Sequence, residues 1–293
     1  MEIAERPAWV DDELFPFKSR FLDLDGHRVH YVDEGSGPTL LFLHGNPTWS
    51  FDYSAVITLL REDFRCVAVD YPGFGLSTAA PGYRYLPAEH AAVIGGFVDA
   101  LGLSNITLLG HDWGGPIGLA VLQHRPEILD RLVLTNTWAW PVSDPLIQVM
   151  SHVMGSPIGR LLIRQLNLFV NVMIPVGHRL TTPTSRQMDH YKKALDSPAR
   201  REASAVFPRE ITSSRAFLAD IEAGLEDIAA VPTLIIWGDG DFAFGDKDLR
   251  RWQETFTDHE TVIVSGAGHF VPSDAPEQFA AAILRWHTRA GSQ

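Results

Sequence analysis

The segment Gly110-His-Asp-Trp-Gly114 places a carboxylate inside a short turn with a glycine at each end. An apolar run, Ile106 to Leu109, precedes it and reads as a buried strand, and a helical pattern, Ile117 to Gln123, follows it. Glycines two positions before and after Asp112 suit a strained strand-to-helix elbow, because bulkier residues would collide with the crossing backbone. Such an elbow lifts its central side chain above the sheet, beside the N–H groups of the helix start. A tight turn with a capping aspartate is the alternative interpretation.

An aspartate at this position implies different chemistry from a serine. A carboxylate with an ordinary pKa of about 3.9 is already ionised at neutral pH, whereas a serine must first lose a proton. Its attack on a saturated carbon forms an alkyl ester, which water then cleaves at the acyl carbon. A serine would form an ether, which water cannot cleave in this way. Asp112 therefore predicts displacement at an sp³ carbon through a covalent alkyl-enzyme intermediate.

Other chemically capable residues follow other predicted strands. His44 to Trp49 follows the apolar run 39–43, two aspartates follow Trp237, and His269 lies in a glycine-rich turn after another strand. In a parallel sheet, ligand-binding residues gather at the carboxyl ends of strands. The order nucleophile, acid, histidine along the chain is that of the α/β hydrolases. We therefore predict His269 as the base that acts beside Asp112.

The acid that orients this base follows one of two strands. The strand that ends at Thr135 is followed by Asn136 and by no nearby carboxylate, whereas Asp239 and Asp241 both follow the later strand. We predict Asp241, because it lies further into the loop and is flanked by Phe242, which would help to exclude water. Asp239 then only caps the turn.

Two neutral donors stand next to the predicted nucleophile. Asn46 offers a side-chain amide after His44-Gly45, and Trp113 offers an indole N–H directly after Asp112. A departing halide needs donors that stabilise developing charge and still release the ion. We therefore predict Asn46 and Trp113 as a halide-binding pair. Capping of its own loop by Asn46 and core packing of Trp113 are the alternatives.

The rest of the chain predicts the elements that position these motifs. A hairpin is expected at 18–35, with further strands at 39–43, 65–70, 132–135, 232–237 and 261–264 and helices at about 51–61, 87–101 and 275–289. Strands and helices alternate on both sides of a gap. This alternation predicts an α/β fold, in which a mostly parallel sheet carries helices on both faces.

The gap, residues 137–212, shows several helical stretches and no clear strand pattern. It contains four of the five methionines, which adapt to irregular apolar surfaces. We predict an inserted helical cap at 137–212 on a core domain made of 1–136 and 213–293. The side chains expected to line the pocket are Phe169, Met173, Phe207 and Phe242. Alternatively, the cap residues among these only hold the helical segment together.

The composition limits the classes of partner and the cellular location that fit this protein. The formal charge of −12 argues against nucleic acid or an anionic membrane as a partner. The single cysteine, Cys66, excludes an internal disulfide, fits a reducing compartment and is expected in the core. The start of the chain has no signal-peptide pattern, and no apolar run approaches 18 residues. We therefore expect a cytoplasmic protein.

With these motifs in place, the chain resembles the haloalkane dehalogenases of the α/β-hydrolase superfamily over nearly its whole length. The motifs similar to that family are His44-Gly-Asn-Pro-Thr-Trp-Ser50, Asp70-Tyr-Pro-Gly-Phe-Gly-Leu-Ser77 and Gly110-His-Asp-Trp-Gly-Gly115. The resemblance implies an α/β-hydrolase fold, a small apolar halogenated substrate and no cofactor or metal. It implies Asp112 as nucleophile, His269 as base, and Asn46 with Trp113 as the halide pair. Asn136 with Asp241 is similar to a subfamily whose members form large oligomers, which implies a homo-oligomer.

Two other functions compete with dehalogenation. Soluble epoxide hydrolases share Gly-His-Asp-Trp-Gly, but they carry a bulky residue where this chain has Asn46, and they use two cap tyrosines. Segment 137–212 contains only Tyr191. Fluoroacetate dehalogenases carry arginine at the position of Trp113, so a charged haloacid fits poorly. A non-catalytic receptor for a small ligand is a hypothesis of another class, and it predicts function that survives loss of Asp112.

Overall fold

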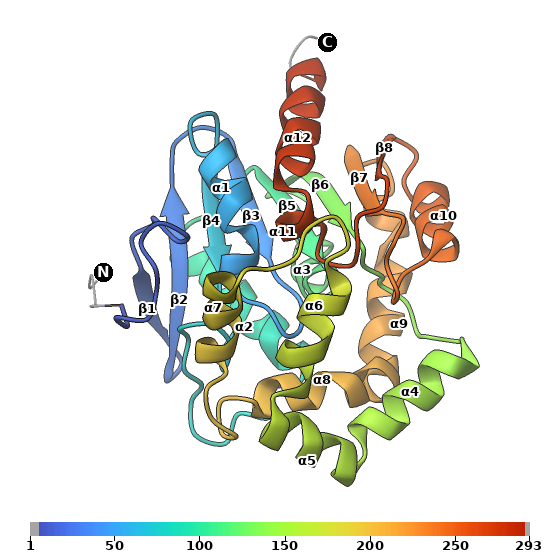
Figure 1. The fold of residues 1–293 in the computed structure, drawn as a ribbon. Helices are drawn as coiled ribbons and strands as arrows, with labels where there is room; N and C mark the ends of the chain where they lie inside the picture. Colours follow the sequence, from blue (N-terminus) through green and yellow to red (C-terminus); the bar gives the residue numbers. More distant parts are fainter. Residues whose placement is uncertain (1–5, 291–293) are drawn as a thin grey trace.

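Eight strands form one sheet in the computed structural model, which describes residues 6–290 (Figure 1). In chain order they are β1 Arg20–Leu24, β2 His27–Glu34, β3 Thr39–Leu43, β4 Arg65–Val69, β5 Ile106–His111, β6 Leu129–Thr135, β7 Thr233–Gly238 and β8 His259–Val264. Across the sheet the order is β1-β2-β4-β3-β5-β6-β7-β8. The pairs β1–β2 and β2–β4 are antiparallel and the later pairs are parallel. The predicted sheet, led by a hairpin, is confirmed.

Helices cover both faces of this sheet. They are α1 Ser54–Leu60, α2 Pro87–Ala100, α3 Gly114–Leu122, α9 Arg215–Gly224, α10 Asp246–Thr255, α11 Val271–Asp274 and α12 Pro276–Ala290, with short 3-10 turns η1 Ser50–Tyr53 and η3 Glu226–Ile228. Side chains of β3 alternate between the faces. Leu41 and Leu43 join the apolar cluster under α2, α3, α9 and α10, and Leu40 and Phe42 join the cluster under α1 and α12. Cys66 is a free, buried cysteine of the second cluster, as predicted.

Besides the four-residue α11, the helices α9 and α10 have no counterpart among the predicted elements. In α9, Leu218 and Ile221 are buried at helical spacing, so a local signal was present. Helix α10 is mostly charged and buries only Leu249 and Trp252. Its apolar signal is therefore too sparse to distinguish it from a polar loop.

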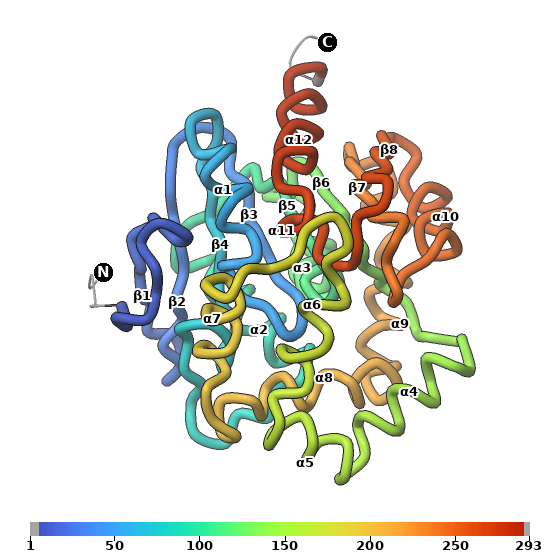
Figure 2. The backbone as a smooth tube through the Cα atoms, viewed as in Figure 1, coloured from blue at the N-terminus to red at the C-terminus, as the bar shows by residue number. Residues whose placement is uncertain are grey.

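A helical segment is inserted between β6 and α9, and the tube in Figure 2 follows it out from the sheet and back. Its elements are α4 Pro145–Gly155, α5 Pro157–Leu166, the π-helical turn η2 Phe169–Met173, α6 Ile174–Gly177, α7 Ser185–Ala194 and α8 Glu202–Ser213. These helices occupy the predicted cap, whose limits at 137 and 212 stay a prediction. Helices α4 and α5 expose large apolar side chains, among them Leu146, Val153, Ile158 and Leu161.

Within residues 6–290, no single helix combines the length and apolar character needed to cross a membrane. Helices α4 and α5 satisfy both conditions only as a pair, and they are bent by 67°. The expectation of no signal peptide rests on the start of the chain, of which residues 1–5 lie outside the described part.

The buried carboxylate of Asp274 ties the end of the cap to the core. It accepts hydrogen bonds from the backbone N–H groups of Arg179, Leu180, Thr181 and Gly268. Burial opposes the charge on Asp274, but these N–H groups outweigh it and lower the pKa of the carboxyl group. Residues 179–181 of the cap and the loop before α11 therefore share one anchor.

Candidate active site

Asp112 occupies a sharp turn between β5 and α3. Its backbone has φ 48°, in the left-handed region that residues other than glycine adopt only with strain. A Cβ atom at Gly110 would lie 2.8 Å from the backbone of α3, and one at Gly114 would collide with the carbonyl oxygen of Leu43. Glycine is therefore required on both sides of Asp112. The predicted strand-to-helix elbow is confirmed.

The carboxylate of Asp112 is held by backbone donors. Its Oδ1 accepts a hydrogen bond of 2.9 Å from the N–H of Asn46, and the N–H of Trp113 is a second donor. Burial raises the pKa of Asp112 above the usual aspartate range, while the charge of His269 and the two N–H groups act in the opposite direction. The side chain keeps 13% of its surface exposed, so it remains reachable from outside.

His269 lies beside Asp112 in the loop between β8 and α11. Its Nε2 is 3.8 Å from Oδ2 of Asp112, and its Nδ1 is 2.9 Å from Oδ2 of Asp241. Burial disfavours the charged imidazole, but the Asp241 carboxylate outweighs this and raises the pKa of His269 to about 9. In the resting site, His269 is therefore an imidazolium between two carboxylates.

The two aspartates after β7 occupy different environments. Asp241 is fully buried against His269 and also accepts a hydrogen bond of 2.7 Å from the N–H of Ala243. Asp239 turns the other way, where its carboxylate accepts hydrogen bonds from the N–H of Gly266 and the hydroxyl of Ser265. Asp239 therefore stabilises the loop that leads to the histidine and does not touch its ring.

Asn136 follows β6 in place of an acid, and the family resemblance paired it with Asp241 without giving it a role. Its Nδ2 donates to Oδ2 of Asp241 at 2.7 Å and to the carbonyl of Gly238 at 3.1 Å, and its Oδ1 accepts from the N–H of Gly238. Its backbone is left-handed, with φ 38°. Asn136 thus fixes the carboxylate behind His269. A polar residue at the carboxyl end of β6 was the available signal.

The predicted halide pair flanks the nucleophile. Trp113 is 2% exposed, and its ring meets Trp138 edge-on at 4.7 Å and Phe207 at 5.0 Å. The side-chain Nδ2 of Asn46 makes a long contact of 3.4 Å with the carbonyl of Ser204 on α8, and its Oδ1 is buried without a hydrogen-bond partner among the described residues. Trp113 therefore also packs in the core, and Asn46 also links its loop to the cap.

The four predicted pocket residues fall into two groups. Phe207 packs on Trp113, and the ring of Phe242, 48% exposed, lies 5.5 Å from that of His269. Phe169 and Met173 instead pack within a separate small apolar cluster of the cap. The first pair adjoins Trp113 and His269, whereas the second pair packs against Ile163 and Ala205 of the cap.

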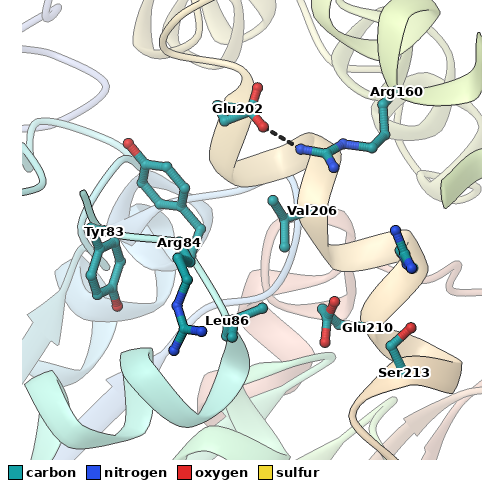
Figure 3. A pocket seen from close by; sticks show the side chains of 10 residues that line it. Tyr83, Arg84, Leu86, Arg160, Glu202, Val206, Glu210 and Ser213 are labelled. Carbon is teal, nitrogen blue, oxygen red and sulfur yellow. Dashed lines mark hydrogen bonds and ion pairs between the residues drawn. The ribbon is translucent and has the colours of Figure 1, made fainter. Parts of the chain in front are cut away.

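A cavity of about 530 Å³ lies apart from these residues (Figure 3). It is lined by Tyr83, Arg84 and Tyr85 of the core and by Glu202, Val206 and Arg209 of α8. The other side of α8 faces the elbow, because Ser204 contacts Asn46 and Phe207 packs on Trp113. Helix α8 therefore separates the cavity from Asp112. The cavity is lined by none of the predicted site residues.

Tyr191, the cap tyrosine that bears on the epoxide alternative, is hydrogen-bonded to another side chain. It is 2% exposed and donates its hydroxyl to Oδ1 of Asp52 at 3.1 Å. It is therefore occupied in the core and is not free to hold an epoxide oxygen. Among residues 6–290, no group of three or more histidine, cysteine, aspartate or glutamate side chains is placed to hold a metal ion.

Comparisons of this chain with known protein families, sequences and structures agree on its family. Residues 38–276 match the family described as alpha/beta hydrolase fold. The chain is 45% identical to haloalkane dehalogenase 2 of Mycobacterium tuberculosis over 278 residues, which are 94% of this chain and 96% of the relative. It is 32% identical to the cis-3-alkyl-4-alkyloxetan-2-one decarboxylase of Shewanella oneidensis, over 94% of this chain and 90% of that protein. The crystal structure of haloalkane dehalogenase DatA from Agrobacterium tumefaciens C58 is similar with a TM-score of 0.84 at 26% identity, covering 93% of this chain and 96% of that one.

Proposed function

This chain belongs to the haloalkane dehalogenases of the α/β-hydrolase fold, and on that premise we propose that Asp112 and His269 hydrolyse carbon–halogen bonds of small apolar haloalkanes. The products are an alcohol, a halide ion and a proton. One observation carries the proposal. A carboxylate at a strained elbow, held by two N–H groups, lies 3.8 Å from a histidine that is itself paired with Asp241.

In the first step, a carboxylate oxygen of Asp112 attacks the carbon that bears the halogen. The C–O bond forms as the carbon–halogen bond breaks, and the bonding electron pair leaves with the halide. We assign the amide of Asn46 and the indole of Trp113 as donors to this ion. By analogy with an oxyanion donor, each contributes about 3 kcal/mol at the transition state. Both donors are neutral, which favours release of the halide afterwards.

The second step is hydrolysis of the ester on Asp112. Alkylation removes the negative charge that helps to raise the pKa of His269, so the imidazole becomes a better base once the ester has formed. Neutral His269 takes a proton from water, and the resulting hydroxide equivalent attacks the ester carbonyl. The N–H groups of Asn46 and Trp113, which face the carboxylate before reaction, stabilise the oxyanion. Collapse breaks the bond between the acyl carbon and the alkoxy oxygen. The alkoxide takes one proton of the attacking water and leaves as the alcohol, while the other proton passes from His269 to solvent, which restores ionised Asp112 and neutral His269.

Competing substrates can be separated with one panel. Wild-type protein is offered bromoalkanes, an epoxide and a cis-3,4-dialkyl oxetan-2-one, the last because the chain resembles an oxetan-2-one decarboxylase. We expect halide release from the bromoalkanes. Diol from the epoxide without halide release would favour the epoxide alternative, and CO₂ from the lactone alone would favour the decarboxylase. A receptor would turn over none of these and would still bind ligand after Asp112→Ala.

The covalent intermediate has its own test. In His269→Ala the ester forms but is not hydrolysed, so we expect the mass of one alkyl group on the peptide that contains Asp112. The variant Asp239→Asn serves as the matched control, because Asp239 does not touch the histidine ring. Unmodified protein after long exposure to a substrate that the wild type consumes would exclude this mechanism.

We further propose a cytoplasmic enzyme that needs no cofactor or metal and that self-associates. The buried free thiol of Cys66 is compatible with a reducing compartment. Full activity after treatment with a chelator supports the metal-free reaction, and loss of activity contradicts it. Fractionation of the cells would test the location, and sedimentation velocity would test self-association.

A further inference from the structure

Behind His269 lies a second carboxylate and imidazole that the proposed reaction does not use. The side chains of Asp52, in η1, and His111, the last residue of β5, are both fully buried, with Oδ2 and Nδ1 at 3.7 Å. The ring of His111 is 4.8 Å from that of His269, centroid to centroid. Its Nε2 lies 2.8 Å from the carbonyl oxygen of His269. The side chain of His111 thus links Asp52 to the backbone of His269, the proposed base.

The hydrogen-bond partners of His111 determine where its proton is. A carbonyl oxygen only accepts, so Nε2 carries the hydrogen that it donates to His269. In a neutral ring, Nδ1 is then a lone pair, and it faces Oδ2 of Asp52. Neither atom has a hydrogen-bond partner among the described residues. Two facing acceptors in a buried site repel each other unless a proton lies between them, and 3.7 Å is within reach of a hydrogen bond after a small rotation.

Burial indicates which of the two groups holds this proton. It raises the pKa of Asp52 and lowers the pKa of His111, so both shifts favour a neutral carboxylic acid facing a neutral imidazole. Other titratable groups also act on the pair. They are His44 after β3, Tyr53 in η1, His178 after α6, Tyr191 on α7 and His269 itself.

The other oxygen of Asp52 holds the far end of the same loop. Its Oδ1 accepts hydrogen bonds from the hydroxyl of Ser273 at 2.7 Å and from Tyr191 at 3.1 Å. Ser273 lies in α11, four residues after His269, and its hydroxyl also contacts Nε2 of His178 at 2.9 Å. One carboxyl group therefore contacts the loop of the base from two sides.

We propose that Asp52 is a positioning residue, which keeps a proton between its carboxyl group and His111 and thereby fixes the loop that carries His269. The proton keeps His111 in the form that donates to the carbonyl of His269. This inference rests on the proposed role of His269 in ester hydrolysis.

Substitutions of Asp52 test the proton separately from the packing. In Asp52→Asn, the amide N–H₂ replaces the O–H toward His111, and the amide oxygen still accepts from Ser273. We expect ester hydrolysis within about threefold of wild type. In Asp52→Ala both contacts are lost, and we expect the single-turnover rate of hydrolysis to fall by about 10- to 100-fold, with the alkylation rate little changed. Tyr191→Phe is the control, because it removes only one donor to Oδ1.

Two further measurements keep the test decisive if Asp52→Ala folds poorly. Ser273→Ala removes the hydrogen bond from Ser273 to Oδ1 of Asp52 and leaves His111 in place. It should slow hydrolysis by a few fold, again without slowing alkylation. The infrared spectrum of the wild type at neutral pH should contain a protonated-carboxyl band that is absent from Asp52→Asn. A folded Asp52→Asn as slow as Asp52→Ala, no missing band, or wild-type hydrolysis in Asp52→Ala would each overturn the proposal. Failure of the proposed function itself would appear as no halide release by the wild type.

Discussion

Two pairs of aspartate and histidine lie next to each other in this molecule and differ in charge. Asp241 and His269 are 2.9 Å apart, whereas Asp52 and His111 are 3.7 Å apart. The side chains of both pairs are at most 4% exposed. Nevertheless, the pKa of His269 is raised to about 9, while that of His111 is held well below its usual value. Burial alone therefore does not decide the protonation of a histidine.

The difference lies in the donors that surround each carboxylate. Asp241 receives hydrogen bonds on both oxygens, from Ala243 on Oδ1 and from Asn136 and His269 on Oδ2. Asp52 receives donors on Oδ1 only. In addition, His269 faces a second carboxylate, Asp112. The charged form of His269 is therefore favoured beside two carboxylates, and our proposal is that the pair behind it is neutral.

The largest effect is expected from removal of Asp112, the second carboxylate that faces His269. In Asp112→Ala no ester forms, and we expect halide release to fall by more than about 10⁴-fold. The rate of bromide release from a bromoalkane measures this, with circular dichroism to show that the protein is folded. Residual turnover above one thousandth of the wild-type rate would mean that another group is the nucleophile.

The next largest effect comes from neutralising Asp241. In Asp241→Asn the imidazolium loses its partner, and by analogy with other triads we expect a loss of about 10³- to 10⁴-fold in turnover. The pKa of His269 should also move down, toward its ordinary range. Ester accumulation in stopped reactions, followed by mass spectrometry, checks the step that is affected. Asp239→Asn should stay near wild type, and an equal loss there would reassign the acid.

A smaller effect is expected at the halide donors, which act on the first step only. Trp113→Phe keeps the ring but removes the indole N–H, and we expect alkylation to slow by about 10²-fold. Hydrolysis of ester already formed should change little, because the backbone N–H at position 113 is retained. Single-turnover kinetics separate the two steps. Equal slowing of both would instead indicate that the ring supports the site by packing.

The smallest expected effect is that of pH, which changes the rate of either step by at most tenfold per pH unit. Alkylation needs ionised Asp112, so it should fall as the pH drops through the raised pKa of this group. Hydrolysis needs neutral His269, so its rate should rise with pH and level off below pH 9, because the ester has removed the Asp112 charge. Quenched single turnovers across pH 5 to about 9.5 test both signs. Hydrolysis that slows with rising pH would contradict the role of His269.

Local signals explain how much of the site was predictable from sequence. The elbow was visible because its constraint is local: glycines at fixed offsets around Asp112 between an apolar strand and a helix. His269 and Asp241 were found because the order of strands brings their loops to one edge of a parallel sheet.

Long-range contacts explain what was missed. Asp52 meets Ser273 across 221 positions in the chain, and neither residue stands in a recognisable motif. The expected place of Phe169 and Met173 at the pocket stays a prediction, because helix orientation in the cap depends on tertiary packing. Apolar character alone does not reveal which face of such a helix meets the substrate.

The four backbone hydrogen bonds to Asp274 have a mechanical consequence. They join residues 179–181 of the cap to the loop that carries His269. Movement of this end of the cap away from the core would therefore also displace His269. An opening of the cap at residues 179–181 would therefore disrupt the contact between His269 and Asp112. Helices α4 and α5, which expose apolar side chains, take no part in this anchor.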